Sequence, residues 1–154
     1  MFFINKSNSH NGNVQAPPIS NRINIFLGAL SVFILVLHWV ATYIFKWYQP
    51  DNHFDDFMHL LAGFWLGLIV IMLVKKYSLF TLENKFVINC LLIASLALTI
   101  GVFWELFEFS MDYLTRHFYN QSILPVNVAD TLGDLFYDFT GASLAALFFL
   151  KKDK

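Results

Sequence analysis

Residues 23–45 read INIFLGALSVFILVLHWVATYIF, an apolar run with few polar side chains and no Lys, Arg, Asp or Glu. A helix needs about 20 such residues to cross the hydrocarbon core of a bilayer. Three more runs of comparable length follow along the chain. We predict transmembrane helices over residues 23–45, 55–74, 86–109 and 130–150. The expected fold is therefore an all-α membrane protein, a bundle of four transmembrane helices.

The composition agrees with a membrane protein. Of the 154 residues, 57% are hydrophobic and 14% are charged, whereas a soluble domain carries about 25% charged residues. Cys90 is the single cysteine, which excludes an intrachain disulfide and a cysteine-based zinc site. No basic patch indicates a nucleic-acid partner, and we expect membrane lipids around the chain.

The segments outside the helices divide the chain into three parts. Residues 1–22 hold Asn, Ser, Gly and the pair Pro17 and Pro18 and lack an apolar core, so they predict a disordered cytoplasmic tail rather than a cleaved signal peptide. Residues 23–150 are the predicted four-helix transmembrane domain, with a long loop expected over residues 113–129. Residues 151–154 are the expected basic C-terminal tail.

The distribution of positive charge predicts the topology, because loops rich in Lys and Arg stay cytoplasmic. Four spans place the N-terminal tail, the middle loop and the C-terminal tail on one side. Eight cations fall on that side: Lys6, Arg22, Lys75, Lys76, Lys85, Lys151, Lys152 and Lys154. Lys46 and Arg116 fall on the other side. Both termini are therefore expected in the cytoplasm.

Acidic residues are distributed in the opposite way. Nine carboxylates fall on the outer side: Asp51, Asp55, Asp56, Glu105, Glu108, Asp112, Asp130, Asp134 and Asp138. Two outer cations cannot neutralise nine carboxylates by salt bridges. Protons, a bound metal ion or hydration must therefore offset the charge of this group.

The spacing of the acidic residues places several of them on common helix faces. Asp55 and His59 are four residues apart, as are Asp134 and Asp138, and residues at this spacing are neighbours on a helix. Carboxylates at membrane depth usually face the bundle interior and have a function. We predict a metal site at the outer helix ends, formed by His59, Glu105, Glu108, Asp134 and Asp138. Weaker candidates for the same site are His38, Asp55, Asp112 and Asp130.

The identity of the expected divalent metal ion stays open. Oxygen-rich ligand sets suit Mg²⁺, Ca²⁺ or Mn²⁺, and Zn²⁺ or Fe²⁺ would fit if both His38 and His59 bind. Structural roles compete for some of these residues. Asp55 and Asp130 stand where N-caps of their helices are expected, and His38 is explained as well by a hydrogen bond within an apolar helix.

Small and aromatic residues have packing roles in this interpretation. Small residues permit close approach of helices. They occur as Gly63 and Gly67, four residues apart in the second predicted helix, and at residues 141–143 of the fourth. Trp39, Trp47 and Tyr48 are expected in an aromatic belt at the membrane interface.

Three motifs in this order resemble a family of uncharacterised bacterial inner-membrane proteins typified by YjdF, and more distantly the VanZ-like membrane proteins. They are D-x-x-x-H at Asp55, W-E-x-x-E at Trp104, and D-T-L-G-D-L-x-x-D-x-x-G-A at Asp130. The resemblance covers residues 25–150. It implies a multi-pass protein of the bacterial inner (plasma) membrane. For the VanZ-like group it also implies a link to cell-envelope biology such as glycopeptide tolerance.

Three functions are compatible with these features. The favoured one is a metal-assisted enzyme that acts on a lipid or cell-envelope precursor from the outer leaflet. The second is a cation- or proton-binding transport element in a homo-oligomer. The third is a structural accessory subunit of a membrane complex. The inner halves of the later helices carry small neutral polar groups, such as Asn89, Ser95 and Ser143, which argues against an ion path through one chain.

Overall fold

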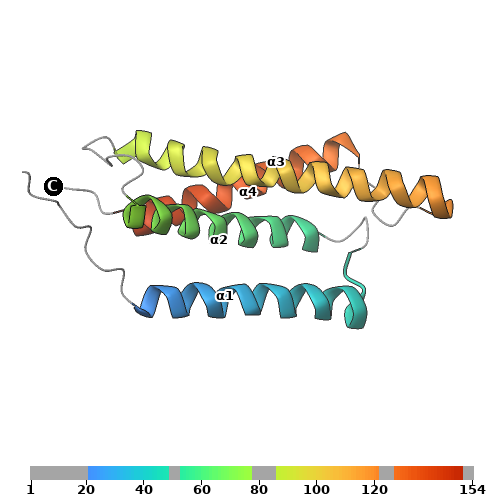
Figure 1. Ribbon diagram of the computed structural model, residues 1–154, viewed down its shortest axis with the longest axis horizontal. Coiled ribbons are helices and arrows are strands. Elements are labelled where there is room, and N and C mark those ends of the chain that lie inside the picture. Colours follow the sequence, from blue (N-terminus) through green and yellow to red (C-terminus); the bar gives the residue numbers. More distant parts are fainter. Residues whose placement is uncertain (1–20, 49–52, 78–85, 122–126, 151–154) are drawn as a thin grey trace, which may run out of the picture.

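The computed structural model describes residues 21–48, 53–77, 86–121 and 127–150, and every element within them is a helix. Helix α1 spans Asn21–Val40 and continues as a π-helical turn, η1, over Ala41–Phe45. The other helices are α2 (Phe54–Tyr77), α3 (Phe86–Tyr119) and α4 (Val128–Phe149) (Figure 1). The predicted tails lie outside the described residues, except that residues 21 and 22 already belong to α1.

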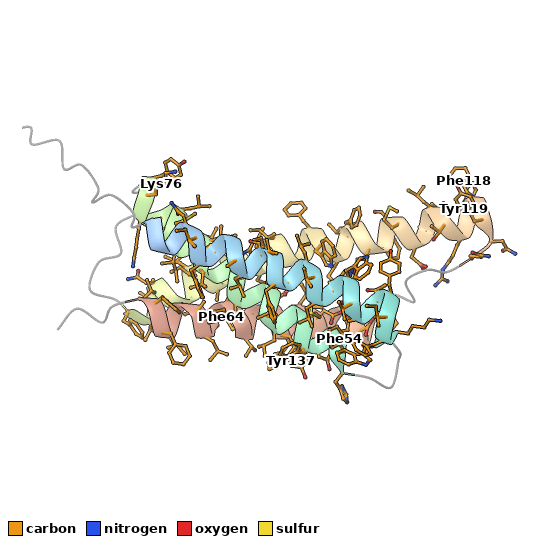
Figure 2. The ribbon with its side chains drawn as sticks, turned by 90° about the horizontal axis from the view of Figure 1, so that it is seen from below. Phe54, Phe64, Lys76, Phe118, Tyr119 and Tyr137 are labelled. Atoms are coloured by element: carbon orange, nitrogen blue, oxygen red, sulfur yellow. The ribbon has the colours of Figure 1, made fainter. Side chains whose placement is uncertain are left out.

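The long loop predicted over residues 113–129 is partly wrong, because α3 continues to Tyr119. Asp112 and Arg116 form an ion pair one helical turn apart, with 2.6 Å between Oδ2 and Nε, and such pairs stabilise helices. At 1.5 Å per residue α3 is about 51 Å long and α2 about 36 Å. The last turns of α3, with Phe118 and Tyr119, therefore project beyond the other helices, at the opposite end of the bundle from Lys76 (Figure 2).

Helices α2, α3 and α4 form the core of the bundle, and α1 lies mainly against α2. Helices α2 and α4 run parallel to each other, and α3 runs antiparallel to both (Figure 1). We call the end where α2 and α4 begin the acidic end, and the end with Lys75 and Lys76 the lysine end. All the described acidic residues lie in the halves of the helices toward the acidic end.

Small residues bring α2 and α4 together. Gly63 faces the backbone of Asp138, and Gly67 faces Ala142, whose Cα would lie 2.9 Å from a Cβ added at Gly67. Gly141 in turn faces the backbone of Leu60 and Phe64. The prediction that Gly63 and Gly67 lie against another helix is confirmed, and that helix is α4.

Apolar side chains close the bundle at the lysine end. A buried cluster there joins α2, α3 and α4, and it comprises Val70, Ile71, Val74, Ile93, Ala146 and Leu150. Helix α1 joins the core through Leu27, which packs with Leu68 and Ala145. Among the described residues, the buried polar side chains other than Asn89 of α3 lie toward the other end.

Three segments of the described chain are long and apolar enough to cross a membrane: Asn24–Phe45, Phe54–Tyr77 and Phe86–Tyr119. Helix α4 has a sufficient length of 22 residues but is not among them, because Asp130, Asp134 and Asp138 lower its hydropathy. The structure thus supports an all-helical membrane protein with three candidate spans. The fourth span and the location of the termini stay predictions.

Candidate functional site

His59 lies at the centre of a group of carboxylates at the acidic end. Its Nε2 atom is 3.9 Å from Oδ1 of Asp55 and 3.8 Å from Oδ1 of Asp134. Its Nδ1 atom is 3.4 Å from Oδ1 of Asp138. His59, Asp134 and Asp138 are buried, whereas Asp55 is half-buried. We call these four residues the His59 cluster.

Helix geometry explains why these residues meet. Asp55 and His59 are one turn apart on α2, and Asp134 and Asp138 are one turn apart on α4. Because α2 and α4 run parallel and touch at Gly63 and Asp138, the turns on their acidic side lie at the same level. The cluster is therefore positioned by the glycine contact between the two helices.

The two ring nitrogens of His59 have different surroundings. The Nε2 distances of 3.8 and 3.9 Å exceed the range of ordinary hydrogen bonds, which is about 2.7–3.2 Å. Asp55, His59 and Asp134 each offer a ligand atom, and these atoms all lie within 4.8 Å of one another. Two ligands that each lie about 2.0–2.2 Å from one ion can be at most about 4.4 Å apart, so this group can hold a metal ion after a small inward movement.

Asp138 lies between α2 and α3. Its Oδ1 faces His59, while its Oδ2 lies against Gly101 of α3, where an added Cβ would clash with it. Gly101 therefore leaves the space that the carboxylate occupies. A carboxylate that receives the second ring N–H of a metal-binding histidine fixes the orientation of that ring. Asp138 lies on that side of the ring, at 3.4 Å, slightly beyond ordinary hydrogen-bond distance.

Glu105 is the buried carboxylate that α3 contributes, with 6% of its surface exposed. It interacts electrostatically with His59 and Asp138, and the side chain of Thr131 of α4 lies near it. Its Oε1 atom is buried and has no hydrogen-bond partner among the described residues. Glu108, one turn farther along α3, is half-buried and interacts with Glu105, His59 and Asp55.

Tyr48 borders the site from the end of α1. Lys46 ends η1 with a left-handed φ of 52°, and the chain then returns so that the Tyr48 hydroxyl lies 2.7 Å from Nδ1 of His38. Burial, together with nearby Asp55 and Glu108, raises the pKa of Tyr48 above its usual value. The hydroxyl therefore keeps its proton.

The remaining sequence candidates are not members of the His59 cluster, although His38 and Asp130 act electrostatically on Asp55. His38 is exposed and bonded to Tyr48, as the hydrogen-bonding alternative describes. Asp112 is buried in its ion pair with Arg116. Asp130 is exposed, and its backbone N–H donates to the side chain of Asn127.

The capping roles considered for two aspartates are wrong. Asn127, rather than Asp130, is the N-cap of α4. Asp55 lies inside the first turn of α2, after Phe54. Asp55 instead belongs to the group that can hold a metal ion, so this weaker sequence candidate is more central than Glu108, which was ranked above it.

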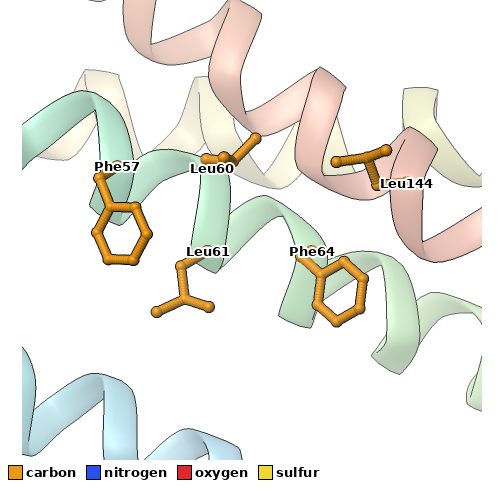
Figure 3. A pocket seen from close by; sticks show the side chains of 5 residues that line it. All are labelled: Phe57, Leu60, Leu61, Phe64 and Leu144. Carbon is orange, nitrogen blue, oxygen red and sulfur yellow. The ribbon is translucent and has the colours of Figure 1, made fainter.

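A separate apolar pocket of about 160 Å³ lies on another face of α2. Phe57, Leu60, Leu61 and Phe64 of α2 line it together with Leu144 of α4 (Figure 3). None of its lining residues is polar, so it contributes no ligand or acid–base group to the site.

Two contributors to the site were not recognised in the sequence as parts of it. Gly101 is four residues before Glu105, and that spacing places both on one face of α3. Tyr48 was interpreted as a membrane-interface residue. Its contact with His38 depends on the turn at Lys46, which no sequence pattern indicates.

The chain matches the model of the family described as "Predicted membrane protein (DUF2238)" over residues 16–154. No curated protein and no solved structure matches the chain. The family description agrees with the three long apolar helices. The relation to YjdF and to the VanZ-like proteins stays a prediction.

Proposed function

The chain belongs to the DUF2238 family of predicted membrane proteins, and we propose that it is a metal-dependent membrane enzyme that acts on a lipid or cell-envelope precursor. The observation that carries the proposal is the arrangement around His59. Its Nε2 faces Asp55 and Asp134, while its Nδ1 faces Asp138. This is the order of groups found in carboxylate–histidine–metal sites.

The ligand set combines carboxylate oxygens with an imidazole nitrogen, and it favours a divalent cation. Two carboxylates and one imidazole would hold the ion, since His38 is bonded to Tyr48 and is not in the group. Carboxylate and water ligands suit Mg²⁺ and Mn²⁺, whereas imidazole is a common ligand of Zn²⁺ and Fe²⁺. We propose Mn²⁺, because the two carboxylates outnumber the one imidazole. Such an ion polarises a phosphoryl or acyl oxygen or lowers the pKa of a bound water.

The depth of the site supports a lipid substrate. His59 is five residues after the start of α2 and Asp134 is six after the start of α4, so both lie roughly 8–9 Å below the helix ends. With four spans and cytoplasmic termini, this level is the boundary between headgroups and hydrocarbon in the outer leaflet. The phosphate and ester groups of lipids lie at that boundary.

The closed lysine end favours this proposal over a transport element. Below the His59 cluster the core is filled by the buried apolar cluster around Val74 and Ile93. A site that opens toward one side of the membrane suits binding and catalysis. An ion path would need polar groups continuing toward the lysine end.

Metal analysis of the full chain purified in mild detergent tests the binding step. We expect Mn²⁺ to be retained by the wild type and by Asp56→Asn, and to be lost from Asp55→Asn. The two variants remove the same charge from adjacent residues of α2, but Asp56 pairs with exposed His53 rather than with the cluster. Equal metal contents of Asp55→Asn and Asp56→Asn would refute the site.

The catalytic step has a separate test. Purified protein in mixed micelles of detergent and bacterial phospholipid is expected to release fatty acid or inorganic phosphate. EDTA and Asp55→Asn should stop the release, while Asp56→Asn should leave it unchanged. If the protein binds the ion but releases neither fatty acid nor phosphate, the metal site would stand and the proposed enzymatic activity would be contradicted.

A further inference from the structure

Glu105 and Glu108 are not explained by a single ion at Asp55, His59 and Asp134. The group that can share one ion excludes both glutamates. Glu105 is nonetheless buried, and its Oε1 atom lacks a hydrogen-bond partner among the described residues. A buried polar atom without a partner is costly, and a buried charge more so unless it is paired or binds a metal. Something else must therefore satisfy this carboxylate.

The charge balance of the site indicates what is missing. Five buried or half-buried carboxylates lie at this level, namely Asp55, Glu105, Glu108, Asp134 and Asp138, and exposed Asp130 lies near them. Within the described residues, the ion pairs of this group all involve His59, and none involves Lys or Arg. Of the two outer cations, Arg116 pairs with Asp112 and Lys46 is exposed. One divalent ion offsets Asp55 and Asp134, and three carboxylates remain.

We propose that the site binds a second divalent cation, held by Glu105 and Glu108 of α3 beside the ion at His59. This inference rests on the proposed function, because it assumes the first ion. The hydroxyl of Thr131, which lies near Glu105, would add an oxygen ligand from α4. The unpartnered Oε1 atom of Glu105 is the free ligand atom that the second ion requires.

Asp138 has the placement of a group between two ions. Its Oδ1 faces His59, and its Oδ2 is directed to α3 at Gly101, one turn from Glu105. The same carboxylate can therefore orient the histidine at the first ion and face the second. Paired ions in enzymes lie about 3.5–4 Å apart and stabilise both the attacking and the leaving oxygen of a displacement. The second ion would thus direct the proposed chemistry toward phosphoryl transfer or hydrolysis.

The first test needs no variant. Full-length protein in mild detergent is loaded with Mn²⁺, washed, and examined by metal analysis and electron paramagnetic resonance. We expect about two ions per chain and the exchange-broadened spectrum of a coupled pair. About one ion per chain with the resolved hyperfine lines of isolated Mn²⁺ would overturn the second site and leave the proposed function intact. No bound ion would refute both.

The variant Glu105→Gln tests whether the second ion binds at Glu105. The substitution keeps the shape of the side chain and removes its charge, so the fold is preserved. We expect about one ion per chain and loss of the coupled spectrum, whereas Asp56→Asn should keep about two. If Glu105→Gln retains the coupled pair, the second ion does not bind at Glu105. If it loses both ions, the division into two sites is wrong.

Discussion

Replacement of Gly63 by alanine tests how closely α2 and α4 must approach. A Cβ at this position would overlap the backbone oxygen and Cα of Asp138. Backbone atoms cannot rotate away, so the two helices must separate or shift. Extra atoms in a well-packed core typically cost about 1–3 kcal/mol. We therefore expect the free energy of unfolding of Gly63→Ala to fall by about 1–3 kcal/mol, despite the better helix propensity of alanine.

Gly133→Ala is the matched control. Gly133 lies in α4, and an added Cβ there would meet no atom within 4 Å. Alanine is favoured over glycine within a helix by about 0.5–1 kcal/mol, so this variant should be slightly more stable than the wild type. The two substitutions thus add the same methyl group and should change stability in opposite directions.

Thermal unfolding in mild detergent, followed by tryptophan fluorescence, measures both variants. A change of 1 kcal/mol shifts the Tm of a chain of this size by about 2–4 °C, so Gly63→Ala should unfold roughly 2–12 °C below the wild type. Equal Tm values for Gly63→Ala and Gly133→Ala would show that α2 and α4 are not in close contact. The role of the glycine in positioning the His59 cluster would then be wrong.

Three other predictions concern the Asp138 carboxylate and the fourth span. Gly101→Ala should displace the Asp138 carboxylate and weaken Mn²⁺ binding by about 10–100-fold. Isothermal titration calorimetry would detect this loss, and an unchanged affinity would contradict the placement of Asp138. Asp138→Asn should weaken binding by a similar factor, whereas a protein whose carboxylates share only protons would tolerate it or become more stable. Reporter fusions after Tyr119 and after Lys154 should report opposite sides of the membrane, and the same side for both would remove the fourth span.

Most of the helical architecture could be predicted from the sequence, because the length of an apolar run is a direct requirement of the bilayer. Helices α1, α2 and α4 begin or end within a few residues of their predicted bounds. The end of α3 was placed ten residues too early, before Asp112. Hydrophobicity gives no signal there, since the last turns are held by the Asp112–Arg116 pair and carry polar as well as aromatic residues.

The candidate site was predictable in part. Helical spacing placed Asp55 with His59, and Asp134 with Asp138, and the structure brings these four residues together. Spacing along single helices could not decide which faces would meet across helices. This is why Asp55 was ranked too low, and why Asp112, which follows Glu108 by one turn, lies outside the cluster.

In this fold, the contact between small residues of α2 and α4 also sets the position of the carboxylates. Gly63 lies one turn after His59, and the Asp138 backbone that it touches lies one turn after Asp134. A larger residue at Gly63 would separate α2 from α4 and lengthen the 3.8 Å distance between His59 and Asp134. In lipid, such contacts stabilise helix pairs because small residues let backbones approach closely. The contact therefore provides both the cohesion of the bundle and the spacing at which two helices can share one ion.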